Sequence, residues 1–211
     1  MKSKDRVQDL AEVYTNTREV NAMLNLVKDT RYDSTFLEPG CGNGNFIVEI
    51  LTRKLKLLIN LQEVKQLKKA GIFDEFDFRL LLSVASIYGI DIDEENIYEC
   101  KTRMFSLIED FYKKYTKNTM DNDFQQSLKY VIDTNIILAD FLNDSKDISI
   151  SEFSEFRGNE IQETRYYLED LLYPNDEIFI KENKLFGHVP TFYTKLDPVN
   201  YRKVFLNNVS K

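Results

Sequence analysis

The chain has 211 residues, 43% of them hydrophobic, and its formal net charge is −7. This length is enough for one domain with a sizeable core, so we expect a single domain over residues 1–211. The acidic balance argues against a general polyanion-binding surface and gives no support to DNA as a partner, which leaves only contact through a local patch.

The sequence also gives no support to a membrane protein or a metal-binding protein. No stretch approaches the about 18 apolar residues of a membrane span, and no signal-type apolar core follows the charged N-terminus, so we expect a cytoplasmic protein. The two cysteines, Cys41 and Cys100, form no CxxC pair, and His188 is the only histidine. We therefore expect no metal site.

The first 30 residues predict a helical arm that is interrupted near residues 14–17. A helix is predicted after the interruption from apolar residues at offsets 0, 3, 4 and 7, namely Val20, Met23, Leu24 and Val27. Thr17 would form the cap at its start, with Tyr14 and Thr15 in the loop before it. Hydroxyls and free amides at a helix start suit a carboxylate, and an ordinary helix cap is the alternative.

Residues 36–46 read as a strand, a glycine-rich loop and the start of a helix. Three of the 7 glycines in the chain lie here within five positions, at Gly40, Gly42 and Gly44. Glycines in this arrangement let the backbone turn sharply and let a ligand lie against the main chain. The alternative is a glycine turn that binds nothing.

The same loop indicates what kind of ligand it would hold. Its spacing differs from the dinucleotide GxGxxG pattern, and it lacks the Gly-Lys-Ser/Thr ending of a triphosphate loop. No lysine or arginine lies between positions 32 and 52. We therefore expect a ligand with little negative charge, from which Glu38 would accept hydrogen bonds of an ammonium or hydroxyl group.

A second strand is predicted at residues 86–91, after helices at 47–58, 61–70 and 75–86. It ends at Asp91, and the helical stripe from Ile97 to Phe111 follows an acidic helix start. A carboxylate at such a strand end can accept both hydroxyls of a ribose. Capping of the next helix is the alternative role, which Asp93 could fill instead.

A third strand is predicted at residues 135–139 and ends in Asp140-Phe141-Leu142. The acid can accept a hydrogen bond from an adenine amino group, and the aromatic ring can lie beside the base, although Phe141 taken singly is a core residue. Glu38, Asp91 and Asp140 thus end three successive strands. Ligands of open α/β sheets bind along that edge, so we predict one shared site.

In this order the motifs resemble those of the S-adenosylmethionine-dependent DNA adenine-N6 methyltransferases of restriction-modification systems. The resemblance covers about residues 12–142. It implies S-adenosylmethionine as cofactor and an α/β, Rossmann-like class I methyltransferase fold. Residues 1–30 would then be a helical N-terminal arm, residues 31–142 the cofactor-binding core and residues 143–211 a divergent tail.

The resemblance also assigns roles to the cofactor-binding residues, which are Tyr14, Thr15, Glu38, Gly40, Gly42, Phe46, Asp91, Ile92, Asp140 and Phe141. The first two would hold the methionine end, Glu38 would contact the ammonium group, and the glycine motif that ends at Phe46 would give close approach. Asp91 would take the ribose hydroxyls. Ile92 would pack on the adenine, while Asp140 would meet its amino group and Phe141 its ring.

One expected motif is missing. Enzymes of this group carry Asn-Pro-Pro-Tyr or Asp-Pro-Pro-Tyr at the end of the fourth strand, where it binds the amino group and stacks the flipped base. This chain offers only two remnants, one after a predicted strand at 165–169, and their candidate catalytic residues are Tyr173, Pro174, Asp197, Pro198 and Tyr201. The tail is also too short for the remaining strands, which predicts an incomplete or modified C-terminal half of the sheet.

The sequence therefore favours an S-adenosylmethionine-binding methyltransferase of the DNA adenine-N6 lineage. The alternative is a catalytically silent cofactor-binding or assembly subunit, whose missing strand a second protein subunit supplies. A methyltransferase for small molecules or proteins is the third interpretation.

Overall fold

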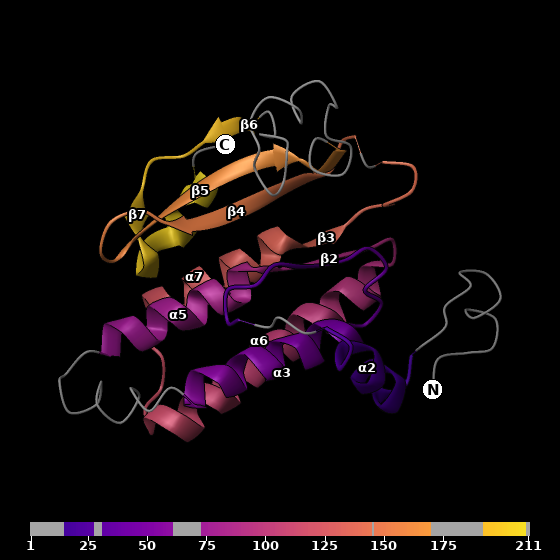
Figure 1. Ribbon diagram of the computed structural model, residues 1–211. Helices are drawn as coiled ribbons and strands as arrows, with labels where there is room; N and C mark the ends of the chain where they lie inside the picture. Colours follow the sequence, from indigo (N-terminus) through magenta and orange to yellow (C-terminus); the bar gives the residue numbers. More distant parts are fainter. Residues whose placement is uncertain (1–14, 28–30, 61–72, 145, 170–191, 210–211) are drawn as a thin grey trace, which may run out of the picture.

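Three short parallel strands form the first sheet, in the order β1 (Phe36–Glu38), β2 (Ile87–Asp91) and β3 (Ile136–Leu138). The computed structural model describes residues 15–27, 31–60, 73–144, 146–169 and 192–209 (Figure 1). β2 lies in the centre, where Gly89 is opposite both Glu38 and Ile136. Because the strands run in one direction, their carboxyl ends meet at one edge of the sheet.

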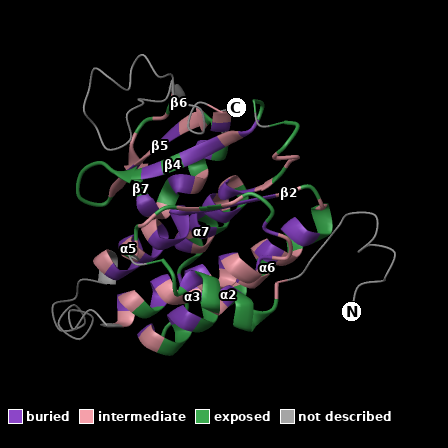
Figure 2. Ribbon diagram, turned by 45° about the vertical axis from the view of Figure 1, so that its right-hand side comes forward, coloured by how far each residue is buried: buried purple, intermediate pink, exposed green. Residues whose placement is uncertain are grey.

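Two long helices cover one face of this sheet (Figure 1). They are α3 (Asn45–Asn60), which follows β1, and α6 (Glu94–Thr116), which follows β2. Successive side chains of β2 point to opposite faces of the sheet. Ile87 belongs to the large core cluster with α3 and α6, whereas Tyr88 and Ile90 belong to a second cluster on the opposite side. Figure 2 shows that the buried residues lie on the inward sides of these elements.

Two further helices lead directly into the strands, α5 (Phe73–Ala85) into β2 and α7 (Asn122–Asn135) into β3. Asp121 caps α7 by accepting the Phe124 N–H at 2.9 Å. The two helix ends are joined because the Asn135 amide donates to the Ala85 carbonyl at 2.8 Å. β2 and β3 therefore begin side by side.

An antiparallel sheet covers the other face of the parallel sheet (Figure 1). Its strands are β4 (Ser149–Glu155), β5 (Glu160–Tyr167), β6 (Phe192–Lys195) and β7 (Val199–Asn200), and β5 pairs with each of the others. Apolar residues Ile148, Ile150 and Leu168 pack on Tyr88 and Ile90 of β2. The described part is thus a mixed α/β protein in which one sheet is parallel and the other antiparallel.

A buried lysine fixes the start of β1. Lys54 of α3 is 1% exposed, and its ammonium group donates to the Tyr32 and Ser34 carbonyls and to the Ser86 hydroxyl. Burial lowers its pKa to about 7, while the three acceptors satisfy all three N–H groups of the charged form. This contact ties α3 to the segments that precede β1 and β2.

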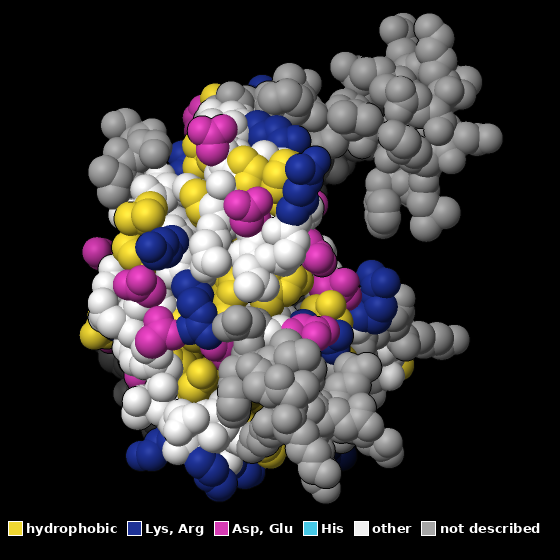
Figure 3. Space-filling view, turned by 90° about the vertical axis from the view of Figure 1, so that its left-hand side faces the viewer, with side chains coloured by type: hydrophobic (Ala, Val, Ile, Leu, Met, Phe, Trp, Pro, Cys, Tyr) yellow, Lys and Arg dark blue, Asp and Glu magenta, His cyan; other side chains and the backbone are white. Residues whose placement is uncertain are grey.

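The C-terminal 3₁₀ helix η1 (Tyr201–Val209) is held to α5 and α7 by an aromatic and ionic cluster. Tyr201 is 1% exposed and meets Phe78 and Phe124 edge to face, with ring centroids 5.6 and 5.9 Å apart. Arg202 pairs with Asp77 and Asp121 and lies over the Phe124 ring. On the face in Figure 3, at this end of the molecule, the described acidic and basic side chains are interspersed without a continuous basic patch.

The structure confirms several predicted elements and corrects others. Helix α2 (Thr17–Leu24) is present, but Asn16 caps it in a reciprocal pair with Glu19, so the expectation of Thr17 as the cap residue is wrong by one position. The third strand begins at Ile136 because Asn135 still belongs to α7. Of the strand expected at 165–169, residues 165–167 belong to β5, whereas residues 168–169 lie beyond its end. The helix expected at 61–70 lies outside the described residues.

None of the described helices combines the length and apolar character that crossing a bilayer requires.

The buried Asp77 carboxyl predicts a pH dependence of stability. Burial raises its pKa to about 6, against the opposing effect of Arg202, whereas an unfolded aspartate titrates near 4. The folded state therefore holds this proton more tightly, so the contribution to stability is complete below about pH 4 and is lost as the pH rises through about 6. Asp77→Asn should flatten this dependence by up to about 3 kcal/mol between pH 4 and 7, measured by urea unfolding. Parallel pH profiles for parent and variant would contradict it.

Candidate functional site

The glycine loop (residues 39–44) folds back over the end of β2. The Gly42 N–H donates to Oδ2 of Asp91 at 2.8 Å, and the Cys41 N–H donates to the Ile90 carbonyl at 2.9 Å. Gly42 and Gly44 have φ angles of +51° and +87°, which residues with a Cβ rarely adopt. The loop after β1 and the acid at the end of β2 are thereby brought into direct contact.

Side chains of α6 hold the loop in place by hydrogen bonds. Arg103 donates to the Asn43 carbonyl at 2.6 Å and to Oδ1 of Asn45 at 3.0 Å, while the Asn43 amide donates to Glu99 at 2.9 Å. The Asn45 amide in turn donates to the Thr15 carbonyl at 3.1 Å. These contacts place the segment before α2 beside the loop. Glu99 and Arg103 were not predicted from the sequence, where their only signal is a four-residue spacing on one helix face.

Two free thiols pack beneath the loop. A Cβ at Gly44 would lie 2.5 Å from the Cys100 sulfur, and a Cβ at Gly89 would lie 3.1 Å from the Cys41 sulfur. Both cysteines are buried and unpaired as disulfides. The hydrogen bond with Cys100, together with burial, raises the pKa of Cys41, so this thiol stays protonated. Both cysteines therefore act as packing residues.

Asp91 has limited capacity left for a ligand. Its Oδ1 accepts the Asp93 N–H at 2.9 Å and the Asn96 amide at 3.3 Å, and its Oδ2 accepts the Gly42 N–H. Asp93 caps α6 by accepting the Asn96 N–H, the role expected for it as the alternative to Asp91. One lone pair of Oδ2 is therefore open, so two ribose hydroxyls could bind only if a present contact gave way.

Glu38 is the least committed acid of the three strand ends. It is half-buried at the end of β1, and none of the described residues forms a hydrogen bond or ion pair with its carboxylate. Burial raises the pKa of Glu38 because water no longer solvates its charge fully. A carboxylate in this position is suited to a cationic or hydroxyl-bearing ligand.

At the end of the third strand, the acid already accepts hydrogen bonds from its own loop. The Asp140 carboxylate accepts the Leu142 and Asn143 N–H groups and the Asn143 amide, and the last of these contacts lowers the pKa of Asp140 most. Phe141 packs against the cluster between the two sheets. The Ala139 N–H donates to the Asp91 carbonyl at 3.0 Å, which keeps this loop next to the end of β2.

The remaining predicted residues are divided between this edge and other places. Ile92 follows Asp91 and is 59% exposed, whereas Phe46 packs against the main core from the first turn of α3. Gly40 is exposed, and a Cβ there would meet nothing within 4 Å. Tyr14, Tyr173, Pro174 and His188 lie outside the described residues.

The second set of catalytic candidates lies away from the glycine loop. Tyr201 is enclosed by aromatic rings and contacts Phe124 near the N-terminal end of α7. From there α7 alone extends about 18 Å to the start of β3. Asp197 and Pro198 lie in the segment between β6 and β7 of the second sheet. The structure does not bring these residues to the carboxyl ends of the parallel strands.

Within the described ranges, Cys, His, Asp and Glu side chains form no group of three or more that could hold a metal ion. Comparisons of the chain with protein-family models, with curated proteins and with solved structures found no match.

The loop geometry predicts that alanine substitutions at two of its glycines differ in their effect on stability. Gly44→Ala places a Cβ against the Cys100 sulfur at a positive φ, and should cost about 2–4 kcal/mol of stability. Gly40→Ala meets no neighbour and should change stability by less than about 1 kcal/mol. Chemical unfolding of the two variants beside the parent measures the difference. Equal effects would show that the Gly44–Cys100 contact does not position the loop.

Proposed function

We propose that this chain binds S-adenosylmethionine at the carboxyl ends of β1, β2 and β3, and that it is a methyltransferase of the DNA adenine-N6 lineage. The observation that carries the proposal is the contact between the glycine loop and Asp91, beside Glu38, whose carboxylate has no partner among the described residues. In this view the fold is a Rossmann-like class I methyltransferase fold with a modified C-terminal half.

The topology supports the position of the site. β1 and β2 are each followed by a helix on the same face, and the strand order β1-β2-β3 is that of one half of an open α/β sheet. Ligands of such sheets bind outside the carboxyl ends of the strands. Thr15, the glycine loop, Asp91 and the β3 end are linked there by hydrogen bonds.

The residues at this edge suit the charges of the cofactor. Glu38 would receive the ammonium group of the methionine part, because its carboxylate is half-buried and has no partner among the described residues. Arg103, which contacts the loop, donates its hydrogen bonds to Asn43 and Asn45. The uncompensated carboxylate of Glu38 would attract the positive charge of the cofactor.

The nucleoside part would lie along the ends of β2 and β3. The open lone pair of Asp91 would accept a ribose hydroxyl, and the exposed Ile92 side chain offers an apolar surface for the adenine ring. Among the described residues, Oδ2 of Asp140 accepts only the Asn143 amide, so it retains capacity for the adenine amino group. Bound S-adenosylmethionine would supply a methyl group for direct transfer to a nitrogen, and the chain would contribute mainly positioning.

A second candidate function is a cofactor-binding or assembly subunit that needs a partner chain. It is favoured by one observation: no strand among the described residues pairs with the outer edge of β1, and the strands of the second sheet pair only with one another. A partner could add its strand and catalytic residues at that edge. The enclosed position of Tyr201 supports the same view, because this remnant cannot reach a base without leaving the core.

Glu38→Gln is the sharpest test of cofactor binding. The change keeps the shape of the side chain but removes the charge that would pair with the ammonium group, so affinity for S-adenosylmethionine should fall about tenfold or more. Stability should be unchanged or slightly higher, because no described contact is lost and a desolvated charge is removed. Isothermal titration calorimetry and chemical unfolding measure the two effects.

Glu109→Gln is the matched control, since Glu109 is exposed on α6 away from the strand ends. It should bind like the parent. In the parent, affinity should also weaken as the pH falls through the raised pKa of Glu38, because the protonated carboxyl no longer attracts an ammonium group. A Glu38→Gln variant that binds as tightly as the parent would refute the assignment of this site.

Transfer of labelled methyl groups separates the two functions. We expect the purified chain to label adenine N6 in DNA, and Glu38→Gln to label it more slowly at low cofactor concentration. Label that appears only after a second polypeptide is added would instead establish the subunit function. Cofactor binding without transfer under either condition would favour a different acceptor, such as a small molecule or a protein.

A further inference from the structure

A cavity of about 760 Å³ lies at the outer edge of β3, between α6, α7, β3, the antiparallel sheet and η1. None of its lining residues belongs to the glycine loop or to the strand-end acids. Arg165, Tyr130 and Ser151 form part of its wall, and Lys129 and Lys101 lie around it. Its volume is within the range of small-molecule sites.

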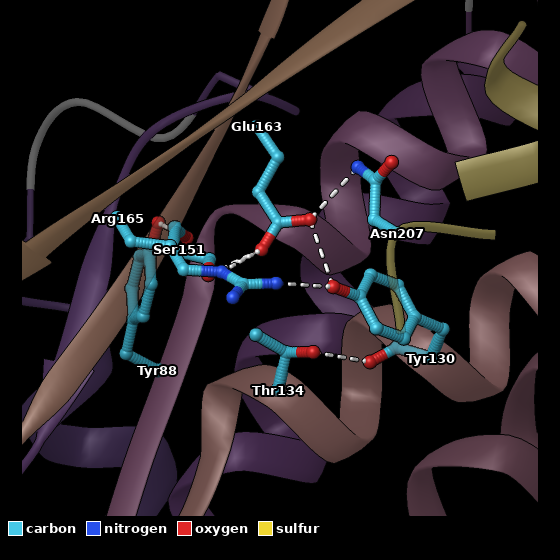
Figure 4. Close-up of polar contacts among 7 residues, drawn as sticks. All are labelled: Tyr88, Tyr130, Thr134, Ser151, Glu163, Arg165 and Asn207. Carbon is cyan, nitrogen blue, oxygen red and sulfur yellow. Dashed lines mark hydrogen bonds and ion pairs between the residues drawn. The ribbon is translucent and has the colours of Figure 1, made fainter. Parts of the chain in front are cut away.

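The polar side chains of this wall are held together by a buried carboxylate (Figure 4). Glu163 is 0% exposed, and its Oε1 accepts the Ser151 hydroxyl and the Arg165 Nε–H, both at 2.8 Å. Its Oε2 accepts the Tyr130 hydroxyl at 2.8 Å and the Asn207 amide at 2.9 Å. The four contacts fill the acceptor sites of the carboxylate, so the network is fully satisfied and holds Arg165 in one orientation.

Arg165 retains donors that this network does not use. Its Nη2 donates to the Tyr130 hydroxyl at 3.2 Å, whereas its Nη1 has no partner among the described residues. The side chain is only 16% exposed and borders the cavity. A fixed guanidinium group with spare N–H groups at a cavity wall is the arrangement that binds carboxylate and phosphate oxygens.

The surrounding charges and the strand edge favour the same ligand class. The cavity lining has three cationic side chains against one carboxylate, Asp133, in a chain whose net charge is −7. Lys101 is paired with Asp133 at 3.0 Å, while the Lys129 ammonium group lies 4.7 Å from the centre of the Phe105 ring. Because Ala139 donates to Asp91 across the ladder, Leu138 directs its own backbone groups outward, toward the cavity.

We propose that this cavity binds a small organic anion through a carboxylate or phosphate group, with Arg165 as the main contact and Lys129 as a second cation. Three residues of open β3 edge are too few to hold an added peptide strand, which favours a small molecule over an extended peptide. The apolar side chains of Ile136 and Ile137 would cover the uncharged part of the ligand. This cavity is separate from the strand-end site, so the proposal does not depend on whether the chain binds the cofactor.

The probes are malonate and inorganic phosphate, each compared with sodium chloride at equal ionic strength. Either anion at about ten times its dissociation constant should raise the melting temperature of the parent by about 3 °C. The anion with the larger effect identifies the preferred group. No rise beyond the chloride control with either probe would overturn the proposal.

Substitutions then locate the site. Lys129→Gln should weaken binding about fivefold, whereas Lys114→Gln should not, although Lys114 also lies over an aromatic ring, that of Tyr115 at 5.2 Å. Arg165→Lys keeps the charge but loses the planar fork and should weaken binding at least tenfold. Should Arg165→Lys fail to fold, the Lys129 and Lys114 pair still decides the matter. Equal anion affinity in the Lys129→Gln and Lys114→Gln variants would place binding elsewhere and refute the site.

Discussion

The contact between Gly44 and Cys100 is the constraint on which the site geometry depends. A Cβ at Gly44 would lie 2.5 Å from the Cys100 sulfur, so the loop can lie this close to α6 only because position 44 has no side chain. α6 begins just after β2, and this approach therefore brings Gly42 within hydrogen-bond distance of Asp91. The packing of the loop on α6 thus brings the carboxyl ends of β1 and β2 into contact.

The local parts of this arrangement could be predicted from the sequence, because they depend on short-range patterns. The three parallel strands and the acids that end them follow from apolar runs bounded by polar residues. Helix α7 was missed although Phe124, Leu128, Val131 and Ile132 carry the helical spacing. The direct passage from this helix into the third strand was therefore not predicted either.

Other features could not be read locally. In β4 and β5, Ser151 and Glu163 are buried polar residues, which breaks the alternation expected of a sheet with one solvated face. They are buried because they satisfy each other across the strand pair and through Tyr130 and Asn207, contacts between residues far apart in the chain. Likewise, the bond from Arg103 to the glycine loop spans 60 positions, and no pattern in either segment indicates it.

The two buried thiols give the molecule a built-in reporter. Cys41 and Cys100 are the only cysteines of the chain, and they are 6% and 0% exposed beneath the glycine loop. Alkylating reagents can reach the Cys100 sulfur only when the loop lifts from α6, so the rate of alkylation measures how often that opening occurs. Any compound that clamps the loop in place would slow this modification, whatever its chemical identity.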